Sequence, residues 1–261
     1  DYDYILCARN GSPLIIGRGK DEMFISSDPH AIREHTDQLV ALEDGQIAKL
    51  DARDFQVMQV DGKKVKSKIL HLEEEWGESE LGDYPHFMLK EIHEQSQSLQ
   101  HCISGRLRHA EGTSALGGLQ IRPQDLSQLP HVRLIGCGTA LHAAQIGQIL
   151  VEQWARIPAV SHVASEFNAN DPVINPKALH LAISQSGETA DTLSAVKEIQ
   201  RKGADVYGIV NVVGSSIARQ CGKGVYIHSG PEQSVASTKA FTNMVGAPVS
   251  YTHLTLPTTW S

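Results

Sequence analysis

The chain lacks long hydrophobic runs. Its longest mostly apolar stretches, such as residues 178–183, are far too short to cross a bilayer, so no membrane is expected as a partner. It also lacks an excess of positive charge, because 23 Lys and Arg face 30 Asp and Glu in 261 residues, for a net charge of −7. Since nucleic-acid backbones are bound by clustered Lys and Arg, no nucleic acid is expected as a partner either.

Cysteine is scarce and scattered. The four cysteines, at positions 7, 102, 137 and 221, are too far apart for a CxxC metal or redox pair and indicate reduced thiols in a cytoplasmic protein. None of the 13 histidines forms a His-x-x-x-His pair with a carboxylate, so we expect no metal and no cofactor. The sequence opens without Met, without a basic segment and without an apolar segment, so we expect a fragment that carries no secretory signal.

The first seventy residues favour short strands separated by turns. Three apolar runs predict adjacent strands, at 4–8, 14–17 and 23–25. Asp44-Gly45 and Asp61-Gly62 each separate two alternating runs, and Asp-Gly in that position predicts a hairpin because Gly accepts the positive φ of a type I′ turn. Residues 1–72 are therefore expected to form a β-rich piece.

An acidic, turn-prone segment, residues 73–80, then predicts an inter-domain linker. Pro85 opens a helical segment, and we assign the linker together with this connecting helix to residues 73–106. One apolar face is expected on the helix. It comprises Phe87, Met88, Ile92, Leu99 and Ile103.

Beyond residue 130, strand and helix patterns alternate. Strands are predicted at 132–136, 159–164, 178–184, 206–210 and 224–227, and helices at 139–157, 190–202 and 215–221. This order predicts an α/β fold in which a parallel sheet carries helices on both faces. A last helix is expected within 236–249. The Thr-rich residues 251–261, which contain Pro257, are not expected to continue it and suggest a non-native tail.

The loop Ser184-Gln185-Ser186-Gly187-Glu188-Thr189 follows an apolar strand and opens a helix. Hydroxyl groups and free N–H groups at a helix start suit a phosphate, although a well-capped turn explains the same residues equally well. No GxxxxGK[ST] motif is present, so ATP and GTP are not expected.

Two more loops have a similar composition, at 136–140 and 234–241. In the first, Cys137 is interpreted as a small buried thiol in preference to a nucleophile. In the second, Lys239 is either a cation near a ligand or a solvated helix residue. Glu188 is interpreted as a capping group in preference to a substrate contact.

Together these loops resemble one known family. The motifs are CGTALHA at 137–143, ASEFN at 164–168, SQSGETADT at 184–192, NVVGSSIAR at 211–219 and SVASTKAFTNM at 234–244. They resemble the first sugar-isomerase (SIS) domain of the glutamine–fructose-6-phosphate aminotransferase family. The segments ARNGSPLIIG at 8–17, LEDGQIAKL at 42–50 and PHFMLKEIHEQ at 85–95 are similar to the end of that family's N-terminal, Ntn-type glutaminase domain and its linker.

The resemblance implies the C-terminal part of the glutaminase domain at 1–72 and the first SIS domain at 107–250. It implies that Thr139, Ser184, Gln185, Ser186 and Thr189 hold the phosphate of fructose 6-phosphate or glucosamine 6-phosphate. Val235 and Ser237 match positions that line the sugar. It also implies a homodimer, glutamine as a substrate only of the full-length protein, and catalytic residues outside this chain, so that the fragment alone is inactive.

Three positions depart from the family pattern. Ala140 replaces a usual Ser in the phosphate loop, Ser234 replaces a usual Gly, and Ser96 replaces a usual Pro. Two alternatives are a non-catalytic SIS module that senses sugar phosphates and a stand-alone isomerase. A sensing regulator needs a basic helix-turn-helix ahead of the SIS domain, whereas residues 1–72 predict hairpins. The aminotransferase is therefore the favoured interpretation.

Overall fold

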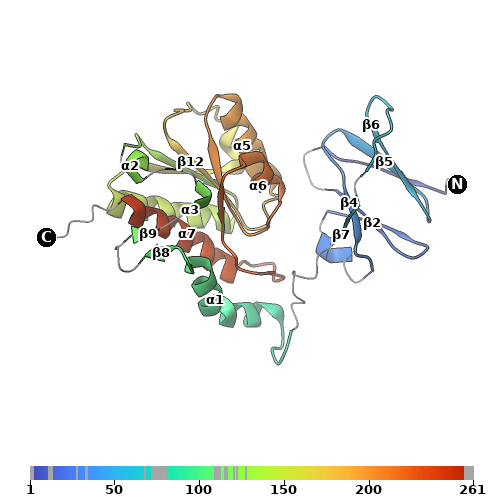
Figure 1. The fold of residues 1–261 in the computed structure, drawn as a ribbon, viewed down its shortest axis with the longest axis horizontal. Coiled ribbons are helices and arrows are strands. Elements are labelled where there is room, and N and C mark those ends of the chain that lie inside the picture. Colours follow the sequence, from blue (N-terminus) through green and yellow to red (C-terminus); the bar gives the residue numbers. More distant parts are fainter. Residues whose placement is uncertain are drawn as a thin grey trace. The chain divides into compact units, whose positions relative to one another are not determined.

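A computed structural model describes residues 3–10, 14–27, 29–32, 35–67, 69–71, 81–108, 113–114, 117–119, 121, 123–126 and 128–255. The chain divides into two compact units, residues 1–78 and 79–261 (Figure 1). In the part of the chain described, no helix is both long and apolar enough to cross a membrane.

The first unit contains two antiparallel sheets. One has the order β1 (Ile5–Ala8), β5 (Gln46–Leu50), β6 (Phe55–Gln59). The other has the order β3 (Met23–Ser26), β2 (Ile15–Arg18), β4 (Gln38–Ala41), β7 (Leu70–His71). A short 3-10 turn, η1, spans Pro29–Ile32. The buried cluster between these strands is small. It comprises Ile16, Val40, Leu42, Ala48, Leu50 and Val57.

The strands of this unit were predicted better than their pairing. The hairpin at Asp61-Gly62 is confirmed, since Gly62 has φ +84° and the Gln59 N–H donates to the Lys63 carbonyl at 2.8 Å. The hairpin at Asp44-Gly45 is wrong, because β4 and β5 belong to different sheets. The expected pairing of β1 with β2 is wrong for the same reason. Each strand is paired with one that is distant in sequence, β1 with β5 and β2 with β4.

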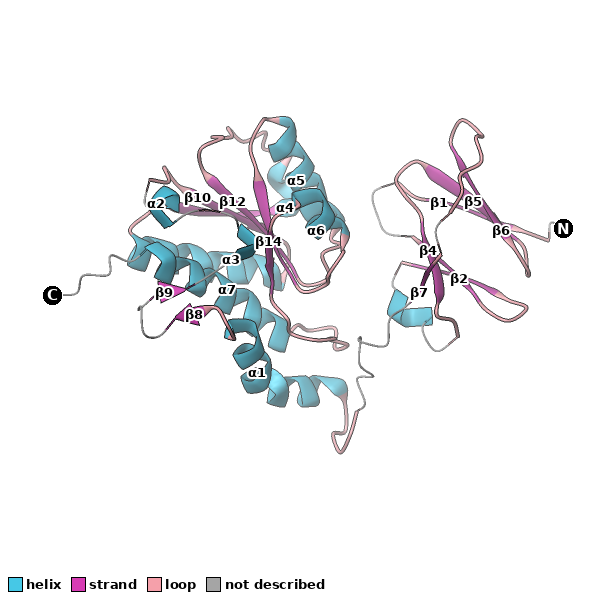
Figure 2. Cartoon of the chain, in the orientation of Figure 1, coloured by secondary structure: helices cyan, strands magenta, loops and turns pink. Residues whose placement is uncertain are grey.

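The second unit is built on the predicted parallel sheet, in the order β11-β10-β12-β13-β14. Helices flank the strands of this sheet (Figure 2). Its strands are β10 (Val132–Gly136), β11 (Ala159–Val163), β12 (Leu179–Ser184), β13 (Val206–Val210) and β14 (Gly224–Tyr226). Its helices are α1 (Phe87–Ile103), α2 (Pro123–Leu126), α3 (Thr139–Leu150), α4 (Ala164–Phe167), α5 (Ala190–Arg201), α6 (Ser216–Cys221) and α7 (Lys239–Thr255). Shorter elements are β8 (Leu107–Arg108), β9 (Thr113–Ser114), η3 (Gly117–Leu119) and a π-helical turn at Val151–Ala155.

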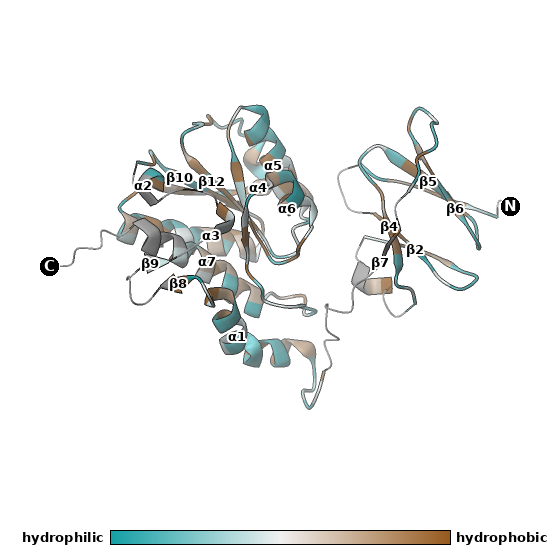
Figure 3. Cartoon of the chain, in the orientation of Figure 1, coloured by the Kyte–Doolittle hydropathy of each residue, from teal (hydrophilic) through white to brown (hydrophobic). Residues whose placement is uncertain are grey.

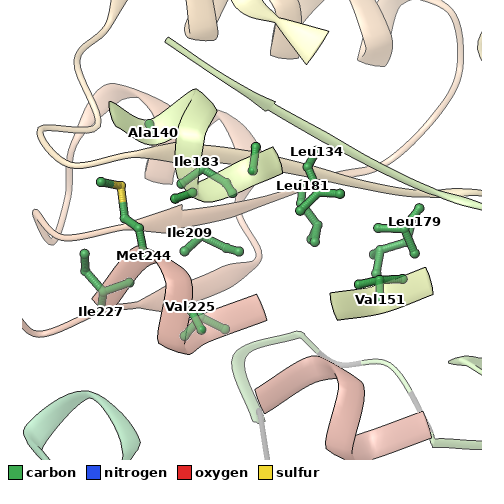
Figure 4. Close-up of a cluster of buried hydrophobic side chains, with 14 of the residues drawn as sticks. Leu134, Ala140, Val151, Leu179, Leu181, Ile183, Ile209, Val225, Ile227 and Met244 are labelled. Atoms are coloured by element: carbon green, nitrogen blue, oxygen red, sulfur yellow. The ribbon is translucent and has the colours of Figure 1, made fainter. Parts of the chain in front are cut away.

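Buried side chains cover both faces of this sheet because successive strand residues point to opposite sides. Leu181 and Ile183 of β12 belong to the cluster that α7 joins through Met244 (Figure 4), whereas Ala182 between them belongs to the cluster that α5 joins. Hydrophobic residues accordingly lie on the strands, and polar residues lie on the outer side of α5 (Figure 3). A sheet covered on both faces accounts for strands that are buried along their whole length.

Two helix expectations are corrected. The fully buried residues of α1 are Glu91, Ser98 and Cys102. Of the predicted apolar face, Phe87, Leu99 and Ile103 are half-buried, whereas Met88 and Ile92 are exposed. The reason is that α1 packs on a polar part of α7 through side-chain hydrogen bonds. In addition, α7 continues through residues 251–255, where no helix was expected. The remaining residues of the predicted tail, 256–261, and residues 73–80 of the predicted linker lie outside the described residues.

Candidate functional site

The loop after β12 is closed by its own hydroxyl groups. Ser184 is buried, and its Oγ accepts a hydrogen bond from the Gly187 N–H at 3.0 Å and lies 3.1 Å from Thr189 Oγ1. Ser186 is half-buried, and its Oγ accepts from the Glu188 N–H at 3.1 Å. Because that bond uses an oxygen lone pair, the Ser186 O–H is still able to donate to a ligand. The structure thus brings four of the predicted phosphate residues, including half-buried Gln185, into one turn.

The same turn leads directly into α5. Thr189 is the N-cap residue and makes no side-chain capping bond, so its side chain leaves the first N–H groups of the helix unused. Gly187 has φ +67°, and a Cβ there would lie 2.0 Å from Ser215 Oγ. Only glycine fits this turn, which allows the backbone to approach a bound group closely.

Thr139 lies on the neighbouring loop. It is exposed at the first residue of α3, which follows β10. Since β10 and β12 are adjacent parallel strands, their carboxyl ends meet at one edge of the sheet, where ligands of α/β folds bind. Ala140 is buried in the sheet-facing cluster. The Ala140 side chain therefore packs in the core and offers no hydroxyl group to a ligand.

Asn211, which was not predicted, connects three loops at this edge. Its N–H donates to the Gln185 carbonyl at 3.2 Å, its Oδ1 accepts from the Ser229 N–H at 2.8 Å, and its Nδ2 donates to the Gly230 carbonyl at 2.8 Å. These hydrogen bonds fix the loop from Ser184 to Thr189 relative to the segment that leads into α7. The position of Asn211 directly after a buried strand is the sequence signal that could have identified it.

The segment before α7 carries the two predicted sugar residues. Val235 is fully exposed, whereas Ser237 is half-buried and donates to Glu232 Oε2 at 2.9 Å. The other Glu232 oxygen accepts from the N–H groups of Thr238 at 2.8 Å and Ala240 at 3.1 Å. Glu232, also missed by sequence reasoning, therefore caps α7 and holds Ser237 in place.

Two alternatives left open by the sequence, those for Lys239 and Glu188, are resolved by the structure. Lys239 is buried and pairs with Glu94 at 2.6 Å, so it is neither solvated nor free for a ligand. Burial opposes ionisation of Glu94, but hydrogen bonds from Lys239 and Lys90 outweigh it and lower the Glu94 pKa. Glu188 caps the neighbouring helix, because its Oε1 accepts from the Ser216 N–H at 2.8 Å. Cys137 is half-buried against the α5-side cluster.

Among the described residues, no group of three or more His, Cys, Asp or Glu side chains is arranged to hold a metal ion. What the sheet edge offers is neutral hydroxyl, amide and backbone N–H donors. Such a donor set suits an oxyanion held by hydrogen bonds at a helix start.

The chain is similar in sequence to known proteins. Residues 125–249 match the SIS domain family. The chain is 44% identical over 242 residues to the glutamine–fructose-6-phosphate aminotransferase [isomerizing] of Bacteroides thetaiotaomicron, a match that covers 92% of this chain and 39% of that protein. It is 41% identical over 247 residues to the enzyme of the same name from Thermus thermophilus, with 95% and 40% covered.

A solved structure agrees. It is the C-terminal domain of glucosamine-fructose-6-phosphate aminotransferase from Francisella tularensis, with a TM-score of 0.61 and 32% identity, covering 67% of this chain and 49% of that one. The second unit therefore contains an α/β domain of the SIS class, at residues 125–249. Over nearly its whole length the chain resembles the glutamine–fructose-6-phosphate aminotransferases, which confirms the predicted resemblance, and it spans about 40% of the length of these curated relatives.

Proposed function

We propose that this chain is part of an enzyme that makes glucosamine 6-phosphate from fructose 6-phosphate and glutamine, and that its SIS domain binds the sugar phosphate. The observation that carries the proposal is the turn from Ser184 to Thr189, where hydroxyl groups converge at the start of α5. Each hydrogen bond to a charged phosphate contributes about 1.5–3 kcal/mol, and the helix start about 0.3–1 kcal/mol. Binding without a lysine is therefore energetically reasonable.

Within this proposal, Ser186 and Thr189 donate to the phosphate, Gln185 lies beside them, and Thr139 adds a hydroxyl from the next loop. Ser184 has a different part: it is buried and shapes the turn from within. Val235 and Ser237 face the sugar from the segment before α7. The free donors on two adjacent loops of one sheet edge support this assignment.

We assign the β-rich unit, residues 1–72, to the C-terminal part of an Ntn-type glutaminase domain. The aminotransferase matches support this, because a match over 92–95% of the chain extends into both units. The same extent favours the enzyme over a SIS module that only senses sugar phosphates. A homodimer and a cytoplasmic location belong to the proposal, and light scattering coupled to size exclusion would test the first.

The test is thermal unfolding of the full chain with and without millimolar fructose 6-phosphate, since a ligand that binds only the folded state raises the midpoint. We expect a rise that Ser186→Ala reduces strongly, because Ser186 is partly exposed and its loss leaves the turn closed by Ser184. Ser96→Ala, on the exposed side of α1, is the matched control and should keep the full rise.

Glucosamine 6-phosphate should give a similar rise, whereas fructose without phosphate should give none. A folded wild-type chain that shows no shift with either sugar phosphate would contradict the binding proposal. An equal shift in Ser186→Ala and in wild type would place the phosphate elsewhere on the molecule.

A further inference from the structure

Glu91 is a fully buried carboxyl group on α1, a helix that lies outside the segment matched to the SIS family. Its Oε1 accepts from the Gln233 N–H at 2.6 Å and from the Ser234 N–H at 3.3 Å. Its Oε2 accepts from the Ser234 hydroxyl. A buried carboxyl group is costly unless its oxygens find donors, and here all of these donors come from the segment before α7.

The rest of α1 fastens the same segment and the start of α7. Glu94 pairs with buried Lys239, the first residue of α7, at 2.6 Å. At the next residue, Gln95 Oε1 accepts from the Thr242 hydroxyl at 2.5 Å. Three side chains of one helix face therefore bond to residues between 233 and 242. The polar face of α1, unexpected from its apolar pattern, is explained by this contact.

Between these anchors the segment presents its exposed part. Glu91 holds residues 233 and 234, and Glu232 holds residues 237 and 238. Val235 and Ala236, which lie in sequence between these two anchored pairs, are exposed. Such a short, doubly anchored segment has few conformations, so the direction in which Val235 and Ser237 face is fixed before any ligand arrives.

We propose that Glu91 is a positioning residue for the sugar end of the site, acting through the Ser234 hydroxyl and two backbone N–H groups. This rests on the proposed function, because Val235 and Ser237 must face the sugar. The phosphate is held by a different loop, on β12, that Glu91 does not touch. Loss of the Glu91 contact should therefore weaken sugar recognition and leave phosphate recognition intact.

The experiment is calorimetric titration of the full chain with fructose 6-phosphate and, separately, with inorganic phosphate. Ser234→Ala and Glu91→Gln should each raise the dissociation constant of fructose 6-phosphate about tenfold, since misplacing positioning groups is costly to recognition. Both variants should bind inorganic phosphate within twofold of wild type. Hydrogen exchange of residues 232–238 should become faster in both.

Two matched variants act as controls. Gln233→Ala changes an exposed side chain but keeps the N–H that Glu91 accepts, and it should bind like wild type. Ser234→Thr keeps the hydroxyl and should restore affinity. Ser234→Ala alters only a half-buried hydroxyl, so it remains informative if Glu91→Gln does not fold.

The outcomes separate the two proposals. If wild type binds fructose 6-phosphate and Ser234→Ala binds it equally well, the positioning role is wrong and the proposed function stands. Equal weakening for both ligands would show a general structural effect and would also overturn the positioning role. If folded wild type binds no sugar phosphate, the proposed function fails and the positioning role fails with it.

Discussion

The two units of this chain bury their hydrophobic residues in different ways. The β-rich unit has strands of two to five residues around six buried side chains, and Ile5 and Leu6 of β1 are exposed. The α/β unit has a sheet covered on both faces by two larger clusters. Stability rises with the apolar area that is buried, so the two units should differ in stability even though one chain connects them.

The largest expected effect comes from creating a cavity in the core of one unit and comparing the loss of stability in the two units. Ile209→Ala, on β13, should destabilise the α/β unit by about 2–5 kcal/mol because Ile209 is completely buried. Leu42→Ala is the matched change in the β-rich unit, where Leu42 is also fully buried. Hydrogen exchange followed by mass spectrometry resolves the two units and should report each loss in its own unit.

We also expect the β-rich unit of the wild-type chain to exchange first, because its cluster is smaller. If Leu42→Ala slows or speeds exchange of β12 and β13 as much as that of β4 and β5, the two units unfold as one cooperative block. The contrast between them would then have no consequence for stability.

A second way to separate the units is acid. His180 of β12 is fully buried, and burial, together with nearby Arg133 and His131, lowers its pKa to about 4 although its Nε2 bonds the Asn175 carbonyl. Between pH 6.5 and 4 the unfolded chain therefore takes up a proton that the folded unit does not. The free energy of unfolding of the α/β unit is therefore unaffected by His180 above pH 6.5. It falls by up to about 3 kcal/mol as the pH is lowered toward 4.

In the described β-rich unit, by contrast, the carboxyl pKa values of Asp51 and Asp61 are lowered by hydrogen bonds, so their contribution is lost only in more acidic solution. Lowering the pH from 7 to 4.5 should therefore destabilise the α/β unit selectively, and denaturant unfolding at the two pH values measures this loss. His180→Gln should reduce that dependence, because burial also lowers the pKa values of His131, His162 and His228 in the same unit. His101→Gln, which changes an exposed histidine on α1, should leave the dependence unchanged. An undiminished dependence in His180→Gln would assign it to other groups.

The difference between the units also explains what could be read from the sequence. In the α/β unit the strands of the parallel sheet are mostly apolar and alternate with helices along the chain. Connections of this kind leave few topologies, so the sheet was predicted correctly. The loop from Ser184 to Thr189 was found because it follows such a strand. Glu91 and Asn211 were missed because their partners are distant in sequence, and α1 was misread because its contact with α7 is polar.

In the β-rich unit, local signals do not determine which strands pair. Gly45 and Gly62 have nearly the same backbone, with φ +81° and +84°, and open space around a Cβ at both, yet only Gly62 closes a hairpin. An Asp-Gly pair therefore predicts the conformation of the turn but not the pairing of the strands beside it. At Asp44-Gly45 the turn forms, yet β4 and β5 belong to different sheets. The pairing is decided by which strands complete the buried cluster.

This argument predicts the smallest effects. Gly45→Ala and Gly62→Ala should each destabilise the β-rich unit by about 1–2 kcal/mol, because an L-residue is disfavoured at positive φ. The two losses should be equal, since the cost lies in the turn and not in the strand pairing, and urea unfolding of both variants measures it. A much larger loss for Gly62→Ala would mean that hairpin closure itself stabilises the unit. The turn would then carry pairing information that the strands alone lack.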